Sequence, residues 1–295
     1  MDEIVKMEHV YQYNEMMGQE TLHPLVSVID FSKCPKARHA RRMYGFYCVF
    51  LKDVKCGDMR YGRHYYDYQG GTLVFIAPGQ VVGIEDNGEV FQPKGWALLF
   101  HPDLIRGTSL GRSMDEYTFF SYEANEALHL SEQERLVVLE CLQNITGELN
   151  HAIDKHSRRL IVSNIELLLN YSIRFYERQF ITRENRNKTV LEELETLLDD
   201  YIASGRLAGA LLPTSEYCAT GLGLSVPYFN DLLKFETGKT LDEYFQLRRL
   251  ETAKRMLLKA ENTPAVVARR LGYASVQYFS LLFKKITGIA PNEYR

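Results

Sequence analysis

The chain has 295 residues, of which 45% are apolar and 25% are charged, and its formal net charge is −3. This length favours two domains, and the composition excludes a low-complexity or membrane-spanning protein. The first residues lack the basic and apolar stretches of a secretory signal, so we expect a cytoplasmic protein. The five cysteines include no C-x-x-C pair, which favours buried free thiols over disulfides or a zinc site.

Residues from about 20 to 122 are predicted to form short strands. Runs rich in aromatic and β-branched residues lie at 44–51, 72–77 and 96–100. Turn signals containing Gly, Pro, Asn and Asp separate these runs at close spacing. Because this pattern is typical of an all-β barrel, we assign residues 1–130 to an N-terminal barrel.

Two long amphipathic helices are predicted within residues 131–180. Ser131 is the expected N-cap of the first helix, and Glu134 stands at the spacing of a capping box. The second helix is expected from about His156 to Tyr176, with isoleucine and leucine at helical spacing. Such helices bury their apolar stripe either against the barrel or against a second subunit, and the periodicity of the sequence is consistent with both. We interpret them as the dimerisation region of a homodimer.

Residues 177–190 are polar, and we assign 181–190 to a linker and 191–295 to a helical domain. This domain contains an internal repeat at an offset of 50 residues, in which Tyr228-Phe229 recurs as Tyr278-Phe279. Each copy reads as a short helix, a glycine-containing turn and a second helix, over 214–235 and 264–285. This order is typical of a helix-turn-helix, whose second helix enters the major groove of DNA.

A single helix over residues 241–260 is predicted to join the two copies. At 1.5 Å per residue it would be about 30 Å long, which would let two recognition helices enter successive major grooves. Residues 245–287 carry nine Lys or Arg against Glu251 and Glu261, a local excess of seven positive charges. That excess supports a DNA partner for an otherwise acidic chain.

Residues from about 189 to 295 resemble the DNA-binding domain of the AraC family of bacterial regulators. The resemblance is carried by the segment that runs from Leu271-Gly272-Tyr273 to Pro291-Asn292-Glu293-Tyr294-Arg295. Four residues of the joining helix also match, namely Tyr244, Arg249, Leu250 and Ala253. The resemblance implies a regulator that binds promoter DNA in a sequence-specific way, usually as an activator that recruits RNA polymerase.

The resemblance also implies which residues contact DNA on the second helix of each copy. In the first copy they are Ser225, Pro227, Tyr228, Asn230, Asp231 and Lys234. In the second copy they are Ser275, Gln277, Tyr278, Ser280, Leu281, Lys284 and Lys285. Carboxamides pair with adenine through two hydrogen bonds, so Asn230 and Gln277 are predicted base readers. The lysines and the helix N-termini are expected to hold phosphates.

Two positions depart from the family, in which a basic residue is common where Asp231 and Leu281 stand. The apolar residues of these helices are expected in the core: Phe229, Leu232, Leu233, Phe279, Leu282 and Phe283.

Residues 70–80 resemble part of a cupin-like barrel, the usual ligand-binding partner of such a DNA-binding domain. Metal-dependent cupins carry an H-x-H pair and a further His after the Pro-Gly turn. Here His64 stands alone and Gln80 follows Pro78-Gly79, so we expect no metal, no other cofactor and no catalytic residue.

We instead expect a pocket for a small-molecule effector in the barrel. Its expected residues are Tyr47, Arg60, Arg63, His64, Tyr66 and Trp96. The aromatic residues in this region would suit a flat or sugar-like ligand. They would equally suit a hydrophobic core that binds no ligand. Inward-pointing arginines would favour an acidic effector.

The predicted fold is α+β with two domains. A cupin-like β-barrel with flanking helices precedes an all-α AraC-type domain, in which a linker helix joins two helix-turn-helix subdomains. The leading hypothesis is a bacterial transcription regulator without enzymatic activity and without a membrane partner. The alternatives are a cupin-type metal enzyme with a helical appendage, and a DNA-binding protein whose barrel only dimerises.

Overall fold

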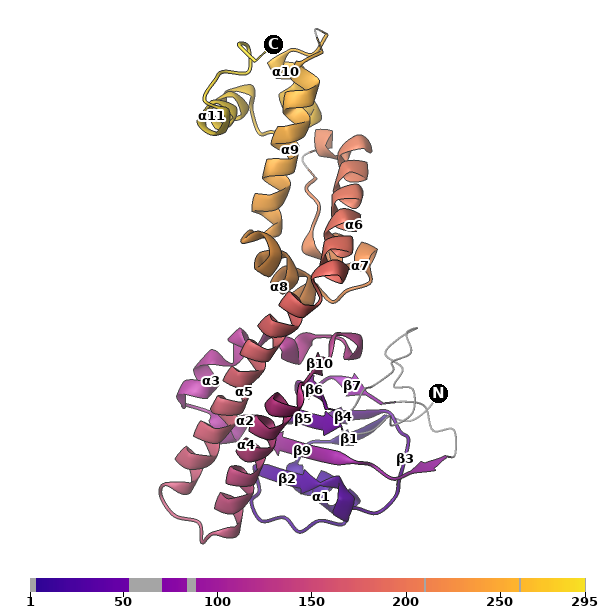
Figure 1. The fold of residues 1–295 in the computed structure, drawn as a ribbon, viewed down its shortest axis with the longest axis vertical. Coiled ribbons are helices and arrows are strands. Elements are labelled where there is room, and N and C mark those ends of the chain that lie inside the picture. Colours follow the sequence, from indigo (N-terminus) through magenta and orange to yellow (C-terminus); the bar gives the residue numbers. More distant parts are fainter. Residues whose placement is uncertain (1–3, 53–70, 84–88, 210, 260, 295) are drawn as a thin grey trace. The chain divides into compact units, whose positions relative to one another are not determined.

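A computed structural model describes residues 4–52, 71–83, 89–209, 211–259 and 261–294 of the chain (Figure 1). The chain divides into two compact units, residues 1–182 and 183–295. The strands lie in the first unit and the second unit is helical, which confirms the predicted fold class. Within the described residues, no helix is long and apolar enough to cross a membrane.

The main sheet of the first unit has five antiparallel strands in the order β10-β6-β5-β9-β2. Their bounds are β2 Val26–Asp30, β5 Tyr47–Lys52, β6 Thr72–Ile76, β9 Gly95–Phe100 and β10 Leu128–His129. The predicted strands at 72–77 and 96–100 are therefore confirmed as β6 and β9. The predicted run at 44–51 is divided, because Tyr44 ends another strand and β5 begins at Tyr47.

Among the described residues, two smaller sheets accompany the main sheet. One consists of β1 (Val5–Met7), β4 (Arg42–Tyr44) and β7 (Val81–Val82), and the other pairs β3 (Ala37–Arg38) with β8 (Val90–Phe91). Tyr44 and Val82 share one apolar core with Phe50 and Ile76 of the main sheet, so the two larger sheets enclose this core. The helix α1 (Val10–Met16) adds Val10 and Tyr13 to the same core.

The two faces of the main sheet have different surroundings. Side chains alternate along β5, so Cys48 and Phe50 point into the core between the sheets. Val49 pairs in register with Phe75 of β6, and both point to the opposite face. Phe75 packs there against Phe119, whose ring centroid is 4.3 Å away. Short helices supply much of the cover for that face.

Short helical segments lie between the strands and before the long helices. They are α2 (Pro102–Ile105), α3 (Ser109–Ser113), and single 3₁₀ turns at Phe31–Lys33, Met114–Glu116, Thr118–Ser121 and Ala124–Glu126. The helices α4 (Glu132–Asn150) and α5 (Ser157–Thr182) then pack against each other. The predicted linker residues 181–190 are helical apart from Arg183, because α5 extends to Thr182 and α6 (Glu184–Ala203) begins two residues later.

The capping box predicted at the start of α4 is confirmed. The Ser131 hydroxyl accepts a hydrogen bond from the Glu134 N–H (3.3 Å), and the Glu134 carboxylate accepts one from the Ser131 N–H (2.8 Å). Arg178 of α5 donates to the same carboxylate from Nε (2.9 Å) and Nη2 (2.6 Å). Burial alone would raise the pKa of Glu134, but the hydrogen bonds from Arg178 and Ser131 outweigh it and lower the pKa.

We expect Glu134→Ala to lower the free energy of unfolding of the first unit by about 1 kcal/mol at neutral pH. Because folding lowers the pKa of Glu134, this stabilisation is present above the unfolded value of 4.5 and is lost as the pH falls through the folded pKa. Calorimetric melting of the wild type and of Glu134→Ala should therefore converge in acid. The variant Glu140→Ala, at an exposed position of the same helix, is the control. A difference in melting temperature that persists well below 4.5 would contradict the expectation.

The second unit contains six helices among its described residues. After α6 come α7 (Ser215–Leu222), α8 (Val226–Thr237), α9 (Leu241–Leu257), α10 (Pro264–Arg270) and α11 (Val276–Thr287), with a 3₁₀ turn at Arg206–Gly209. All the predicted helices of this domain are present. One apolar core contains Leu198, Phe229, Leu250 and Phe279, so both helical pairs pack around α9 and α6. With 17 residues, α9 is about 26 Å long, shorter than expected because it ends at Leu257.

Candidate nucleic-acid interface

The two helix-turn-helix copies are built in the same way. The turn after α7 contains Gly223 at φ +66°, and the turn after α10 contains Gly272 at φ +68°. Both angles lie in the left-handed region that glycine adopts without strain. The next helix starts at a serine whose hydroxyl accepts a backbone N–H: Ser225 from Tyr228 (3.3 Å) and Ser275 from Tyr278 (3.0 Å). The N-cap predictions for both serines are confirmed.

The helix α11 is strongly amphipathic. Phe279 and Phe283 are fully buried, and Leu282 packs against the core as a half-buried residue. The opposite side carries a set of exposed residues, which we call the α11 face: Gln277, Tyr278, Leu281, Lys284 and Lys285. At 100° per residue these positions form one continuous stripe. Leu281 is 72% exposed at its centre, which is unusual for an apolar side chain with no partner in the core.

The exposed side of α8 is narrower than the α11 face. Asn230 and Lys234 are exposed one turn apart, and Pro227 and Asp231 are half-buried beside them. These four residues form the α8 face. Tyr228 is only 6% exposed, so the expected surface position of this residue is wrong. It lies one turn before the buried Leu232, on the side of α8 that packs against protein.

The other expected contact residues are accessible at the start and side of their helices. Ser275 is exposed, while Ser225 and Ser280 are half-buried.

The two predicted base readers differ in their hydrogen bonds. The Ser215 hydroxyl donates to Oδ1 of Asn230 (2.9 Å), which orients this amide and leaves its NH₂ group turned to other partners. Gln277 makes no side-chain hydrogen bond to a described residue, and it is exposed. Both carboxamides therefore retain donor and acceptor capacity for a base edge.

Three of the nine cations between residues 245 and 287 are buried or paired with an acid. Arg248 forms ion pairs with Glu195 (3.2 Å) and Asp199 (2.9 Å) of α6. Lys254 pairs with Glu251 at 2.6 Å. Arg249 is buried, and its guanidinium lies 4.0 Å from the centroid of the Tyr273 ring. Burial lowers the pKa of Arg249.

The remaining cations, nine minus these three, are exposed in the described structure: Arg255, Lys259, Arg269, Arg270, Lys284 and Lys285. The local excess of seven charges expected from the sequence therefore overstates the charge that faces outwards.

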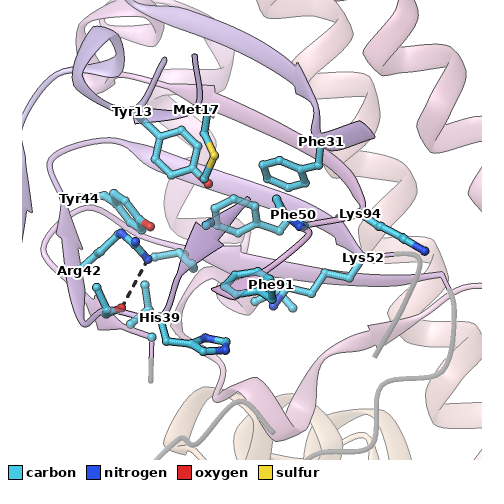
Figure 2. A pocket seen from close by; sticks show the side chains of 17 residues that line it. Tyr13, Met17, Phe31, His39, Arg42, Tyr44, Phe50, Lys52, Phe91 and Lys94 are labelled. Carbon is cyan, nitrogen blue, oxygen red and sulfur yellow. Dashed lines mark hydrogen bonds between the residues drawn. The ribbon is translucent and has the colours of Figure 1, made fainter. Parts of the chain in front are cut away.

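The first unit contains a cavity of about 130 Å³ between its two larger sheets (Figure 2). Aromatic side chains line much of it, including Phe31, Phe50 and Phe91. Tyr47 and Trp96 do not line it, and their expected role in a barrel pocket is not supported. In β5, Tyr47 stands on the opposite face from Phe50, and Trp96 pairs in register with Leu51 on that same opposite face. Arg60, Arg63, His64 and Tyr66 lie outside the described residues.

Reasoning from the sequence missed Tyr13 and Arg42, which line the cavity together with Tyr44. Alternation in the short strand Arg42-Met43-Tyr44 would have indicated that its first and last residues share a face.

The described cysteines Cys34, Cys48, Cys141 and Cys218 are buried and free, as expected for them. Among the described residues, no three His, Cys, Asp or Glu side chains are grouped so as to hold a metal ion.

Comparison with known proteins gives a family-model match within the second unit and further matches over most of the chain. Residues 218–295 match a family model described as a helix-turn-helix domain. The chain is 40% identical over 68 residues to the uncharacterized HTH-type transcriptional regulator YobQ of Bacillus subtilis; the match covers 23% of this chain and 28% of that relative. It is 27% identical to the HTH-type transcriptional activator RhaR of Mannheimia succiniciproducens, over 75% of this chain and 76% of that one. The solved structure of ToxT from Vibrio cholerae matches with a TM-score of 0.31 at 15% identity, covering 91% and 96% of the two chains.

Proposed function

We propose that this chain, a transcriptional regulator of the AraC family with a helix-turn-helix DNA-binding domain, binds promoter DNA with α8 and α11 in neighbouring major grooves. The observation that carries the proposal is the pair of exposed faces on α8 and α11, both backed by one shared apolar core. A single core holds the two helices in a constant relation, as simultaneous binding to two grooves requires. The α9 helix, about 26 Å long, is the element between them.

The chemistry of the two faces supports a division of roles. Gln277 and Asn230 present carboxamides that can pair with adenine, and Leu281 offers an apolar group suited to a thymine methyl. Lys234, Lys284 and Lys285 supply positive charge for phosphates. We propose that the protein activates transcription with RNA polymerase as its partner, and that the first unit regulates it by binding a small-molecule effector, without catalysis. The relative RhaR, which is named as an activator and matches over 75% of this chain, supports this assignment.

Base reading by Gln277 is tested by Gln277→Ala. We expect the variant to lose about 1 to 3 kcal/mol of discrimination at one base pair of the binding site while its binding to unrelated DNA is unchanged. Selection of binding sites from random duplexes, followed by titration of single-base variants, measures this. Asn230→Ala is expected to relax a different position, because it lies in the first copy. Gln143→Ala, at an exposed position on α4, is the matched control. An unchanged preference in both variants would remove these roles.

We further propose that α5 forms a homodimer interface. Leu160 and Leu167 are 46% and 45% exposed, although Ile161, Ile165 and Leu168 of the same helix are buried within the first unit. The two leucines are seven residues apart and therefore share one face, with the spacing of a coiled-coil seam.

We expect the double substitution Leu160→Asp with Leu167→Asp to convert a dimer into a monomer, because two charges would be buried in an apolar seam. Sedimentation velocity measures the change. Leu22→Asp, which alters a leucine 43% exposed elsewhere in the unit, should leave the dimer intact. A wild-type protein that is monomeric at all concentrations would refute the interface.

A further inference from the structure

The lining of the cavity in the first unit combines cationic and apolar side chains. Its lining contains Arg42, Lys52, Lys94 and His39, and no aspartate or glutamate among the described residues. Figure 2 shows Arg42 and Tyr44 on one side of the Phe50 ring and Lys52 and Lys94 on the other. The cations in this lining favour an anionic ligand over a cationic one.

Arg42 has hydrogen-bonding capacity that the protein does not use. Its Nη2 donates to the Arg38 carbonyl (3.2 Å) and its Nη1 to the Ala40 carbonyl (3.5 Å), which hold the guanidinium in place. Its Nε is buried and has no hydrogen-bond partner. An unpaired buried donor on a charged group costs free energy, and an anionic acceptor in the cavity would recover it.

Two buried tyrosines line the same cavity, and Figure 2 shows Tyr44 beside Arg42. Tyr13 and Tyr44 are each 4% exposed, and both line the cavity. Burial raises the pKa of both hydroxyls, so they stay protonated at neutral pH and can donate. Neither hydroxyl makes a hydrogen bond to a described residue. Arg42 and the two hydroxyls together provide the donors that a carboxylate accepts.

The size and walls of the cavity limit the rest of the ligand. A volume of about 130 Å³ is close to that of an apolar cavity that accommodates benzene, roughly 150 Å³. A single ring therefore fits. The described lining contains no Ser, Thr, Asn or Gln, so most hydroxyls of a sugar would remain without partners. Phe31, Phe50 and Phe91 instead offer apolar surface to the body of the ligand.

We propose that this cavity binds a small single-ring carboxylate, whose anionic group is held by Arg42 with Tyr13 and Tyr44 and whose ring packs among Phe31, Phe50 and Phe91. The inference deepens the proposed effector role of the first unit and rests on it for its regulatory meaning. The binding itself is a separate property of the cavity.

The test uses the full-length protein and three probes: benzoate, phenylacetate and the neutral isostere benzamide. By calorimetric titration we expect benzoate or phenylacetate to bind at least about tenfold more tightly than benzamide, the effect of a charge-assisted hydrogen bond. Arg42→Gln should remove this advantage, and Tyr44→Phe should weaken carboxylate binding several-fold. Arg41→Gln, which changes the adjacent exposed arginine that does not line the cavity, should bind as the wild type does.

Three results would overturn the proposal: no binding of either carboxylate at millimolar concentration, equal binding of benzamide, or an Arg42→Gln variant with wild-type affinity. The comparison of benzoate with benzamide needs only the wild type, so it stands even if a variant fails to fold. DNA affinity, measured without ligand, is read separately. A chain that binds benzoate through Arg42 but does not bind DNA would refute the proposed function and leave the cavity assignment intact. A chain that binds DNA but neither carboxylate would refute the cavity assignment and leave the proposed function intact.

Discussion

Gly272→Ala is expected to unfold the second helix-turn-helix and abolish DNA binding, whereas Gly223→Ala, at the same turn of the first copy, should cost only about 1 to 2 kcal/mol. Both glycines have left-handed φ angles, +68° and +66°, so an alanine would suffer a similar backbone strain energy at each position. The surroundings differ. A Cβ at Gly272 would lie 2.4 Å from the Leu207 carbonyl oxygen, but a Cβ at Gly223 would meet nothing within 4 Å.

The clash at Gly272 cannot be relieved by a side-chain rotation, because the obstructing atom belongs to the backbone. We therefore expect a total loss of about 3 to 5 kcal/mol, the range for strain combined with overpacking. Hydrogen exchange of the α10 and α11 amides, together with DNA titration, measures the effect. Gly223→Ala is its matched control. If the α10 and α11 amides are equally protected from hydrogen exchange in the two variants, the close approach of Gly272 to Leu207 is contradicted.

Lys284→Ala combined with Lys285→Ala is expected to weaken binding to all DNA sequences. Each phosphate contact contributes about 0.9 to the slope of log affinity against log salt, so the loss of two contacts should reduce this slope by about 1.8. The base preference should remain, because the α11 face still carries Gln277 and Leu281. Fluorescence anisotropy titrations over a range of salt concentrations, on specific and unrelated duplexes, provide the measurement.

The control for this variant removes the same charge elsewhere. Lys155→Ala with Arg159→Ala alters two exposed cations of the first unit, near the start of α5. That variant should keep the wild-type slope. If both double variants lower the slope equally, the effect reflects net charge rather than phosphate contacts by α11. If the Lys284 and Lys285 variant keeps the full slope, α11 is not the element that meets the phosphates.

Most helices of the chain could be predicted because their signals are local. Ser131, Ser225 and Ser275 cap their helices as expected, and each hydroxyl accepts a backbone N–H three residues away. Such a bond depends only on residues within one turn. The end of α5 was missed for a related reason. A polar surface helix and a polar linker have similar composition, and only the continued backbone hydrogen bonding distinguishes them.

The burial and the contacts of single side chains could not be predicted from the neighbouring residues in the sequence. Tyr228 and Tyr278 stand in the same repeated dipeptide, yet Tyr228 is 6% exposed and Tyr278 is 51% exposed. Arg248 and Arg249 are adjacent, and the sequence predicts that both contribute positive charge towards DNA. The first is paired with Asp199, 49 residues earlier, and the second is stacked on Tyr273. Each outcome depends on a partner that is remote in the sequence.

The sequence by itself determines the two glycine turns and the capping serines. It also determines that α8 and α11 each have a buried side and an exposed side, because residues three or four apart share one side of a helix with 3.6 residues per turn. Alternation likewise reveals that β5 has two faces, but not which of them borders a cavity. That was decided when Tyr13 of α1 and Tyr44 of β4 packed opposite Phe50. Periodicity indicates which side chains share a face within one helix or strand. A binding site, however, combines side chains from elements that are distant in the sequence, and only the tertiary packing determines which of them come together.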